Sequence, residues 1–190
     1  WVRNGDVREK DGLPLSLNLV TTINSVRQKT QQIVKANLAE VGIELVLDQV
    51  DSGIFFDSSP GNEQNLNHMY HDMNMFSSGA PLSLPIQYLS NWTAGENYSN
   101  IAQSANGWNG ANTQRYFNPE YDAEWNRLNG GEYTTLDEAV QSVIRLNDIL
   151  WQDVVTVPLV NRAAGSGSYV IHNSLIHGEG PEGEDNVGLH

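Results

Sequence analysis

The chain has 190 residues, of which 23 are acidic and 10 are basic, so its formal net charge is −13. This excess of acid disfavours nucleic acids and anionic membrane surfaces as partners, because both are bound through clustered Lys and Arg. The absence of cysteine excludes disulfides, thiolate nucleophiles and cysteine-ligated metal centres. The length is sufficient for one domain with its own hydrophobic core.

No apolar run is long enough to span a bilayer, and no signal segment opens the chain. The residues from Trp1 onward are typical of the interior of a longer protein, so we expect the chain to be part of one. The glycine-rich motifs that bind nucleotide phosphates do not occur, and no cofactor is predicted.

The first fifty residues predict a strand, a helix and a second strand. Residues 11–14 form a turn, and residues 15–21 then alternate apolar and polar side chains, as half-buried strands do. Asn24 or Ser25 caps a helix that ends before Gly42, and residues 43–48 alternate again. This order predicts two parallel strands joined by a right-handed crossover. The helix face expected to be buried comprises Val26, Ile33, Val34, Leu38 and Val41.

The middle of the chain contains a predicted third strand within residues 68–78, followed by a long polar stretch over residues 79–114. That stretch is rich in Gly, Asn and Ser, and only residues 85–89 indicate a short helix. A loop of this length in a compact domain is usually functional.

Two amphipathic helices are predicted next. Asn118 caps the first, Pro119 occupies its first turn and Gly130 ends it, while Thr135 begins the second. The first is expected to bury Tyr121, Trp125 and Leu128. The apolar pattern of the second comprises Leu136, Val140, Val143, Ile144, Asn147, Leu150, Trp151 and Val154.

The end of the chain predicts further strands and a tail. Residues 155–160 form a strong strand in which Pro158 favours an edge position, and residues 169–171 form a weaker one. We expect a domain over residues 1–175 and a polar, acidic tail or linker over residues 176–190.

His68, His71 and Asp72 have the composition of a metal site. On a strand the two histidines point to opposite faces, which favours ordinary packing, whereas a helix would allow them to share an ion. The second interpretation implies a metal-dependent hydrolase.

The polar stretch also combines amides and glycines with Trp92, Trp108 and Tyr116. Such side chains suit a binding cleft, because they offer adaptable hydrogen bonds and stacking surfaces. They would equally serve to pin the loop to the core, and both interpretations stay open.

Four segments taken together resemble a known family. These are residues 6–22 (DVREKDGLPLSLNLVTT), 26–51 (VRQKTQQIVKANLAEVGIELVLDQVD), 110–125 (GANTQRYFNPEYDAEW) and 146–163 (LNDILWQDVVTVPLVNRA). Their order and spacing resemble the C-terminal lobe of peptide/nickel-type extracellular solute-binding proteins of ABC transporters. The resemblance covers roughly residues 5–175.

This resemblance implies an α/β fold, with a mixed sheet and packed helices, that forms one lobe of a two-lobed, periplasmic-binding-protein-like protein. Such a protein is extracytoplasmic, often lipid-anchored, and not an enzyme. It captures a solute by closure of two lobes, most often a peptide, although oligosaccharides and metal chelates also occur. The implied partners are the ligand, a membrane permease and the missing N-terminal lobe. A cell-surface interaction module is the alternative from another class.

The resemblance also implies which residues border the ligand. They are Phe76, Ser77, Ser78, Gly79 and Ala80 after the third strand, and Asn112, Arg115 and Tyr116 in the neighbouring loop. Arg115 has a second interpretation, as an ion-pair partner of Glu120 or Asp122. Peptide binders of the family often carry an Asp near Pro81 that pairs with the peptide α-amino group, but residues 73–95 contain no acid. This departure favours a non-peptide cargo, or a peptide held in another way.

Overall fold

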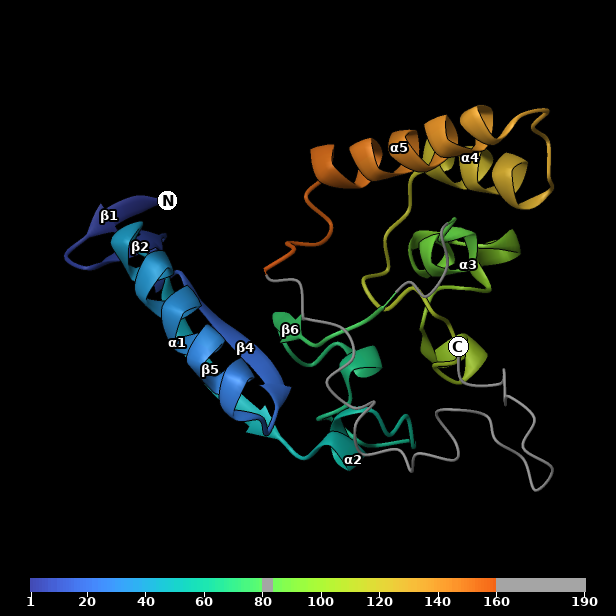
Figure 1. Ribbon diagram of the computed structural model, residues 1–190. Coiled ribbons are helices and arrows are strands. Elements are labelled where there is room, and N and C mark those ends of the chain that lie inside the picture. The colour runs from blue at the N-terminus through green and yellow to red at the C-terminus, as the bar shows by residue number, and fades with distance from the viewer. Residues whose placement is uncertain (80–83, 160–190) are drawn as a thin grey trace, which may run out of the picture. The chain divides into compact units, whose positions relative to one another are not determined.

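The computed structural model describes residues 1–79 and 84–159. By its internal contacts the chain divides into one unit from Trp1 to Val155 and a second from Thr156 to His190. All the helices and strands described below lie in the first unit (Figure 1). They confirm the predicted α/β class, with strands of both orientations and packed helices.

The chain begins with a small antiparallel sheet of three strands in the order β1-β2-β3. Its strands are β1 (Val2–Asn4), β2 (Val7–Lys10) and β3 (Leu13–Pro14). The turn between β2 and β3 consists of Asp11 and Gly12, whose φ angles are 55° and 80°. Two positive φ angles are what a two-residue hairpin requires, so the predicted turn is confirmed at Asp11 and Gly12. Leu13 and Pro14, also expected in the turn, instead form β3.

The main sheet is parallel and has the order β5-β4-β6. It consists of β4 (Ser16–Thr22), β5 (Glu44–Val50) and β6 (Met73–Met75), and α1 (Ser25–Glu40) joins the first two. Asn24 caps α1 by accepting hydrogen bonds from the backbone amides of Val26 and Arg27. Gly42 follows the helix with φ 80°. The predicted parallel strand-helix-strand unit is therefore confirmed.

The side of α1 that packs on the sheet differs from the predicted one. Val26 and Ile33, both expected in the core, are each 62% exposed. The fully buried residue of the helix is instead Gln31, whose Nε2 donates to the carbonyl oxygens of Leu19 and Asp48 at 2.8 and 3.0 Å. Val34 and Leu38 are half-buried, so the predicted face is right in part. A pattern of apolar residues could not predict the burial of Gln31, because that burial depends on hydrogen bonds to the two strands.

A small core lies where the sheet meets α2 (Ser52–Phe55) and the 3-10 helix η1 (Leu66–His68). Its buried members are Val20, Val50, Phe55 and Leu66. The third strand is shorter than the predicted span of residues 68–78, and β6 covers only Met73–Met75. His68 ends η1, and Met69 has φ 58°, so the chain turns there before it becomes extended.

The long polar stretch contains α3 (Ile86–Leu89) and the 3-10 helices η2 (Ser90–Trp92), η3 (Glu96–Tyr98) and η4 (Ser104–Asn106). Asparagine side chains hold it together through hydrogen bonds to the backbone. Asn100 donates to the carbonyls of Ser90 and Thr93, and Asn106 donates to those of Ser99 and Ile101. Side-chain bonds here replace regular secondary structure.

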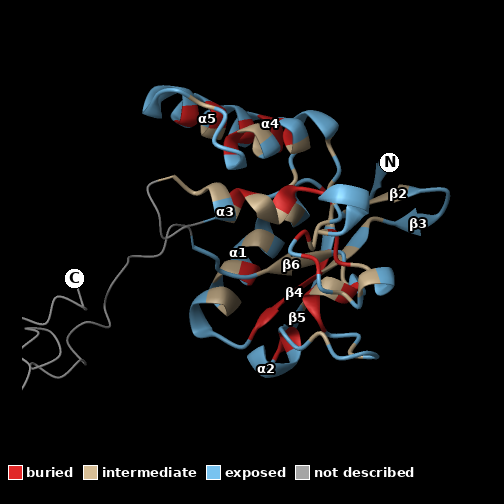
Figure 2. Cartoon of the chain, turned by 90° about the vertical axis from the view of Figure 1, so that its right-hand side faces the viewer, coloured by how far each residue is buried: buried red, intermediate tan, exposed pale blue. Residues whose placement is uncertain are grey.

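The second and larger core lies between α4 (Pro119–Asn129), α5 (Leu136–Gln152) and α3. Its buried members are Leu89, Trp92, Tyr121, Leu128, Ala139, Leu146, Ile149 and Leu150, and they appear as red stretches on the helices in Figure 2. The caps at Asn118, Thr135 and Gly130 are those the sequence predicted.

The buried face of α5 is rotated from the predicted one. Leu136 and Trp151 are exposed, while Ala139 and Ser142 are fully buried against α4. Small residues allow close approach of two helices, so they occupy the contact although they contribute little to an apolar pattern.

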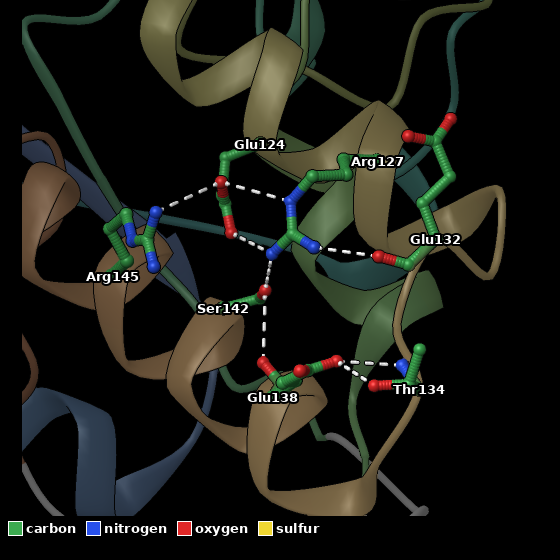
Figure 3. A network of polar contacts seen from close by, with 7 residues as sticks. All are labelled: Glu124, Arg127, Glu132, Thr134, Glu138, Ser142 and Arg145. Atoms are coloured by element: carbon green, nitrogen blue, oxygen red, sulfur yellow. Dashed lines mark hydrogen bonds and ion pairs between the residues drawn. The ribbon is translucent and has the colours of Figure 1, made fainter.

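A polar network joins α4, α5 and the turn between them (Figure 3). Glu124 is 8% exposed and forms ion pairs with Arg127 at 2.8 Å and with Arg145 at 3.4 Å. Arg127 also donates to the Ser142 hydroxyl and, at 2.7 Å, to the carbonyl of Glu132. One buried carboxylate thus links α4 to α5.

The predicted strand over residues 155–160 does not form in its described part, residues 155–159. The Val155 amide bonds back to the carbonyl of Leu150 at the end of α5, and Pro158 has no amide hydrogen for a ladder. Val160, the strand expected at 169–171 and the tail expected at 176–190 lie outside the described residues.

Candidate ligand-binding site

The carboxyl ends of β4, β5 and β6 lie at one edge of the parallel sheet, because parallel strands end on the same side. Thr21 Oγ1 donates to the carbonyl of Met75 at 2.6 Å, and the amide of Ile23 donates to that of Val50 at 3.0 Å, so these ends are tied together. In open α/β sheets ligands bind outside this edge. We call it the carboxyl edge and define it by Thr22, Val50 and Met75.

Residues 76–79 leave the carboxyl edge as exposed coil. Phe76 is 37% exposed and meets Phe56 edge to face, with ring centroids 6.4 Å apart. Phe56 is 52% exposed and packs in the same manner on the buried Phe55 at 5.0 Å. Four of the predicted ligand residues, Phe76 to Gly79, are therefore at the carboxyl edge beside an accessible aromatic surface, and Ala80 lies outside the described residues.

Arg27 also reaches the carboxyl edge, which the sequence did not predict. It lies in the first turn of α1, and its guanidinium donates to the hydroxyls of Thr22 and Ser77, the latter at 3.2 Å. The signal was present in the sequence, since Asn24 caps a helix directly after a strand and so places residue 27 beside the strand end. Thr22 is buried and Arg27 is half-buried.

Asp51 is the acid that follows β5 at this edge. Its carboxylate caps α2 by accepting from the amide of Gly53 at 2.8 Å. Among the described residues neither Asp51 nor any other acid forms an ion pair with Arg27. The carboxyl edge therefore presents a cation held by hydroxyls.

Asn112, predicted to border the ligand, is completely buried. Its Nδ2 donates to the carbonyls of Thr93 and Tyr116 at 3.0 and 2.8 Å, and its Oδ1 accepts from the Tyr116 amide at 3.1 Å. Every hydrogen of the side-chain amide is engaged within the chain. These contacts close the loop over residues 93–116.

Replacement of Asn112 by alanine is expected to lower the free energy of unfolding by about 2 kcal/mol, because it leaves buried carbonyl and amide groups unpaired. Urea denaturation followed by circular dichroism measures this loss. Asn109→Ala is the matched control, since Asn109 is exposed and, among the described residues, its side-chain amide donates only to the carbonyl of Asn106. Unchanged stability of Asn112→Ala would contradict the structural role.

Arg115 and Tyr116 are also engaged within the chain. Arg115 donates to the carbonyl of Ala102 at 3.0 Å and lies over the Trp108 ring at 5.3 Å, and it forms no ion pair with any described acid, so the predicted pairing with Glu120 or Asp122 was wrong. The Tyr116 hydroxyl donates to Asp153 Oδ2 at 2.5 Å. Burial raises the pKa of Tyr116, and the bond to Asp153 raises it further.

The aromatic residues of the polar stretch pin it to the rest of the unit. The Trp108 ring lies 4.5 Å from that of His68, and Tyr116 meets Tyr121 edge to face at 5.9 Å. Trp92 is buried in the larger core. Of the two interpretations of these side chains, pinning accounts for the contacts in the structure.

His68, His71 and Asp72 do not assemble into a metal centre. His68 Nδ1 contacts the carbonyl oxygen of Asn62 at 2.7 Å, and the Asp72 carboxylate accepts from the backbone amide of Asn18 at 2.8 Å. Within residues 1–79 and 84–159, no group of three or more His, Asp or Glu residues is placed to hold a metal ion. His68 Nε2 and His71 Nε2 are buried without a hydrogen-bond partner in the same part of the chain.

Comparison by sequence finds neither a matching family model nor a matching curated protein. Comparison of folds finds substrate-binding proteins. The oligopeptide-binding protein of Thermus thermophilus, complexed with a pentapeptide, aligns with a TM-score of 0.68 and 20% identity over 83% of this chain and 26% of its own. AppA of Bacillus subtilis, in complex with a nonapeptide, aligns with a TM-score of 0.56 and 18% identity over 81% of this chain and 27% of its own.

NikZ of Campylobacter jejuni, in complex with Ni(L-His), aligns with a TM-score of 0.61 and 18% identity, over 80% of this chain and 27% of its own. The chain therefore has the fold of one portion of the oligopeptide- and nickel-binding substrate-binding proteins. It spans about a quarter of the length of these structures. None of the described helices is both long and apolar enough to cross a membrane.

Proposed function

We propose that this chain is the C-terminal ligand-binding lobe of the extracytoplasmic substrate-binding component of an ABC importer. In this proposal the missing N-terminal lobe closes over the solute, and the closed form docks on a membrane permease. No covalent chemistry is involved, and nucleic acid is not a partner. The cargo class that the similar structures favour is a peptide, followed by a metal chelate.

The carboxyl edge is the observation that carries this proposal. It combines an exposed segment, residues 76–79, with the aromatic surface of Phe56 and Phe76 and the guanidinium of Arg27. Exposed backbone can form main-chain hydrogen bonds with a peptide ligand, as one β-strand does with its neighbour. Aromatic rings supply apolar contact. A fold similar to the oligopeptide-binding protein over 83% of the chain supports the same function.

Closure of two lobes explains why one lobe presents so open a surface. Affinity in such a protein comes from the desolvation of the ligand between two surfaces and from hydrogen bonds shared by both. We therefore expect the isolated chain to bind its cargo much more weakly than the two-lobed protein does.

The test uses the two-lobed protein, freed of carried-over ligand by unfolding and refolding. Thermal melting is followed in the presence of pools of peptides, oligosaccharides and metal chelates, because a ligand that binds only the folded state raises the melting temperature. One class is expected to raise it, by an amount equivalent to about 2.7 kcal/mol at a hundredfold excess over Kd.

The 190-residue chain is the matched control for lobe closure, and the pool that stabilises the two-lobed protein is expected to shift its melting temperature little. No shift with any pool would contradict the transport function. An equal shift with the isolated chain would contradict capture between two lobes.

A further inference from the structure

Two sequons, the Asn-x-Ser/Thr sequences that accept N-linked glycans, lie in the polar stretch at residues 91–93 (NWT) and 97–99 (NYS). A sequon is used where it lies in a surface loop of an exported protein. The two are equivalent as sequences, because neither has proline at the middle position. Their surroundings in the structure differ.

The sequon at residues 91–93 is closed by contacts within the chain. Asn91 is half-buried, and its amide donates to the carbonyl of Tyr88 at 2.8 Å. Trp92 and Thr93 are buried, and the Thr93 hydroxyl accepts from the side-chain amide of Asn100 at 3.0 Å. An enzyme could reach this asparagine and its hydroxyl only after local unfolding of the loop.

The sequon at residues 97–99 lies open at the tip of a turn. Asn97, Tyr98 and Ser99 are all exposed. The backbone amide of Ser99 closes the turn by donating to the carbonyl of Glu96 at 3.0 Å. The side-chain amide of Asn97 and the hydroxyl of Ser99 form no hydrogen bond with a described residue. Both groups that define the acceptor are therefore accessible.

The conformation of this turn favours its opening. Asn97 and Tyr98 have φ angles of 52° and 60°. Asparagine tolerates this left-handed region, but a bulky side chain such as tyrosine is rarely found there. An oligosaccharyltransferase must draw the acceptor asparagine into its active site. A turn held in an unfavourable conformation presents that residue at a lower cost than a regular helix or strand would.

An exposed pair of aromatic rings adjoins the same turn. Tyr98 and Phe117 are 51% and 52% exposed, and their rings meet edge to face with centroids 5.4 Å apart. Exposed rings are stabilised when an apolar group covers them. A sugar ring has an apolar face of C–H groups, and a sugar on Asn97 lies within reach of the pair because Tyr98 is the next residue.

We propose that Asn97, and not Asn91, is the acceptor of an N-linked glycan, whose first sugar packs on the aromatic pair. The assignment rests on the extracytoplasmic location in the proposed function. Nδ2 of Asn97 attacks C1 of an oligosaccharide carried on a lipid diphosphate. A C–N bond forms and the bond from C1 to the diphosphate oxygen breaks. The lipid diphosphate leaves with the electron pair, and the amide gives one proton to a basic group of the transferase.

The first measurement is made on the two-lobed protein isolated from its own cells. Mass spectrometry with fragmentation that leaves glycans attached is expected to find a glycan on Asn97 and an unmodified Asn91. Release by a peptide N-glycosidase in water labelled with ¹⁸O converts a glycosylated Asn97 into labelled aspartate, which confirms the residue. An unmodified Asn97 would overturn the assignment.

The second measurement tests the site independently of export. The folded two-lobed protein, produced without glycan, and a synthetic peptide of residues 86–102 are each incubated with a purified oligosaccharyltransferase and a lipid diphosphate-linked oligosaccharide. The ratio of modification at Asn97 to that at Asn91 is expected to be about tenfold or more higher in the folded protein, because only there does Asn91 require local unfolding. Equal ratios would overturn the selection by the fold.

Ser99→Ala is expected to abolish modification of Asn97 in the second measurement, and Ser99→Thr to retain it, because the hydroxyl two positions after the asparagine defines the sequon. Ser104→Ala is the matched control, since Ser104 is exposed in the same stretch but outside the sequon. Undiminished modification of Ser99→Ala would contradict the assignment.

The contact of the sugar with the aromatic pair has its own readout. The glycosylated protein is expected to melt at a higher temperature than the glycan-free form, and Phe117→Ala is expected to reduce this difference. An equal difference in the parent protein and Phe117→Ala would overturn the contact. Failure of the transport function is a separate result, in which Asn97 carries a glycan while no solute pool stabilises the two-lobed protein.

Discussion

Replacement of Gly110 by alanine is expected to lower the free energy of unfolding by about 3 kcal/mol or more, near the upper end for overpacked sites. A Cβ at this position would overlap the carbonyl oxygen of Asn100 and the amide nitrogen of Ala102. These are backbone atoms, so no flexible side chain can move aside. The overlap would also break the pairing of Ile101 with Asn112, where two stretches of the loop meet in parallel.

Urea denaturation at constant protein concentration measures the effect of Gly110→Ala. The control is Gly79→Ala, because a Cβ there meets nothing within 4 Å and its φ is not positive. The control variant should unfold within about 0.5 kcal/mol of the parent chain, as surface substitutions usually do. If both variants unfold at the same urea concentration, the backbone at Gly110 does not lie as close to the backbone of residues 100–102 as it does in the structure.

Replacement of Glu124 by glutamine is expected to destabilise the chain by about 2 kcal/mol. Glutamine preserves the shape but leaves Arg127 and Arg145 without their buried counter-charge, and removal of one partner from a buried pair typically costs about 3–5 kcal/mol. The expected loss is smaller because the two arginine side chains are 34% and 54% exposed and water screens them.

The same variant is expected to change how stability depends on pH. The hydrogen bond from Arg127 holds the pKa of Glu124 below its ordinary value of 4.5, against the opposing effect of burial. The group therefore contributes stability above pH 4.5, and this contribution is lost as the pH falls through the folded-state pKa. The free energy of unfolding of Glu124→Gln should fall less steeply than that of the parent chain over that range.

Glu120→Gln is the matched control, since Glu120 is exposed on the same helix and forms no ion pair with a described residue. Its pH dependence should follow that of the parent chain more closely. If the free energy of unfolding of Glu124→Gln and that of the parent chain decrease equally with falling pH, the network in Figure 3 does not depend on the charge of Glu124.

Local signals in the sequence predicted the parts of the candidate site that follow from a strand end. The alternation before Thr22 and the cap at Asn24 located the turn from β4 into α1. Residues 76–79 were named by the family resemblance, since the strand predicted over residues 68–78 extended past the observed end of β6 at Met75. The cap at Asn24 placed Arg27 beside the strand end, but the contact of Arg27 with Ser77, 50 positions away along the chain, was not predictable. Sequence spacing carries no information about such a pair.

The loop residues illustrate the opposite case. Asn112 and Tyr116 have the composition of ligand-binding residues, but their side chains bond to Thr93 and Asp153 within the chain. Side-chain amides and phenol hydroxyls form hydrogen bonds with groups of the same chain as readily as with a ligand. Residue type alone therefore does not distinguish a structural role from a ligand-binding one.

What the sequence by itself determined is the class of each local element: the hairpin turn at Asp11 and Gly12, the caps of the three long helices, and the parallel strand pair. These depend on backbone preferences and on side chains within a few positions of one another. Only the tertiary structure decided which face of each helix is buried. Gln31 and Ser142 lie inside because distant carbonyls and Arg127 satisfy their polar groups, whereas Ile33 and Leu136 lie outside. A polar side chain is buried where the folded chain places a hydrogen-bond partner beside it, and this partner comes from a remote part of the sequence.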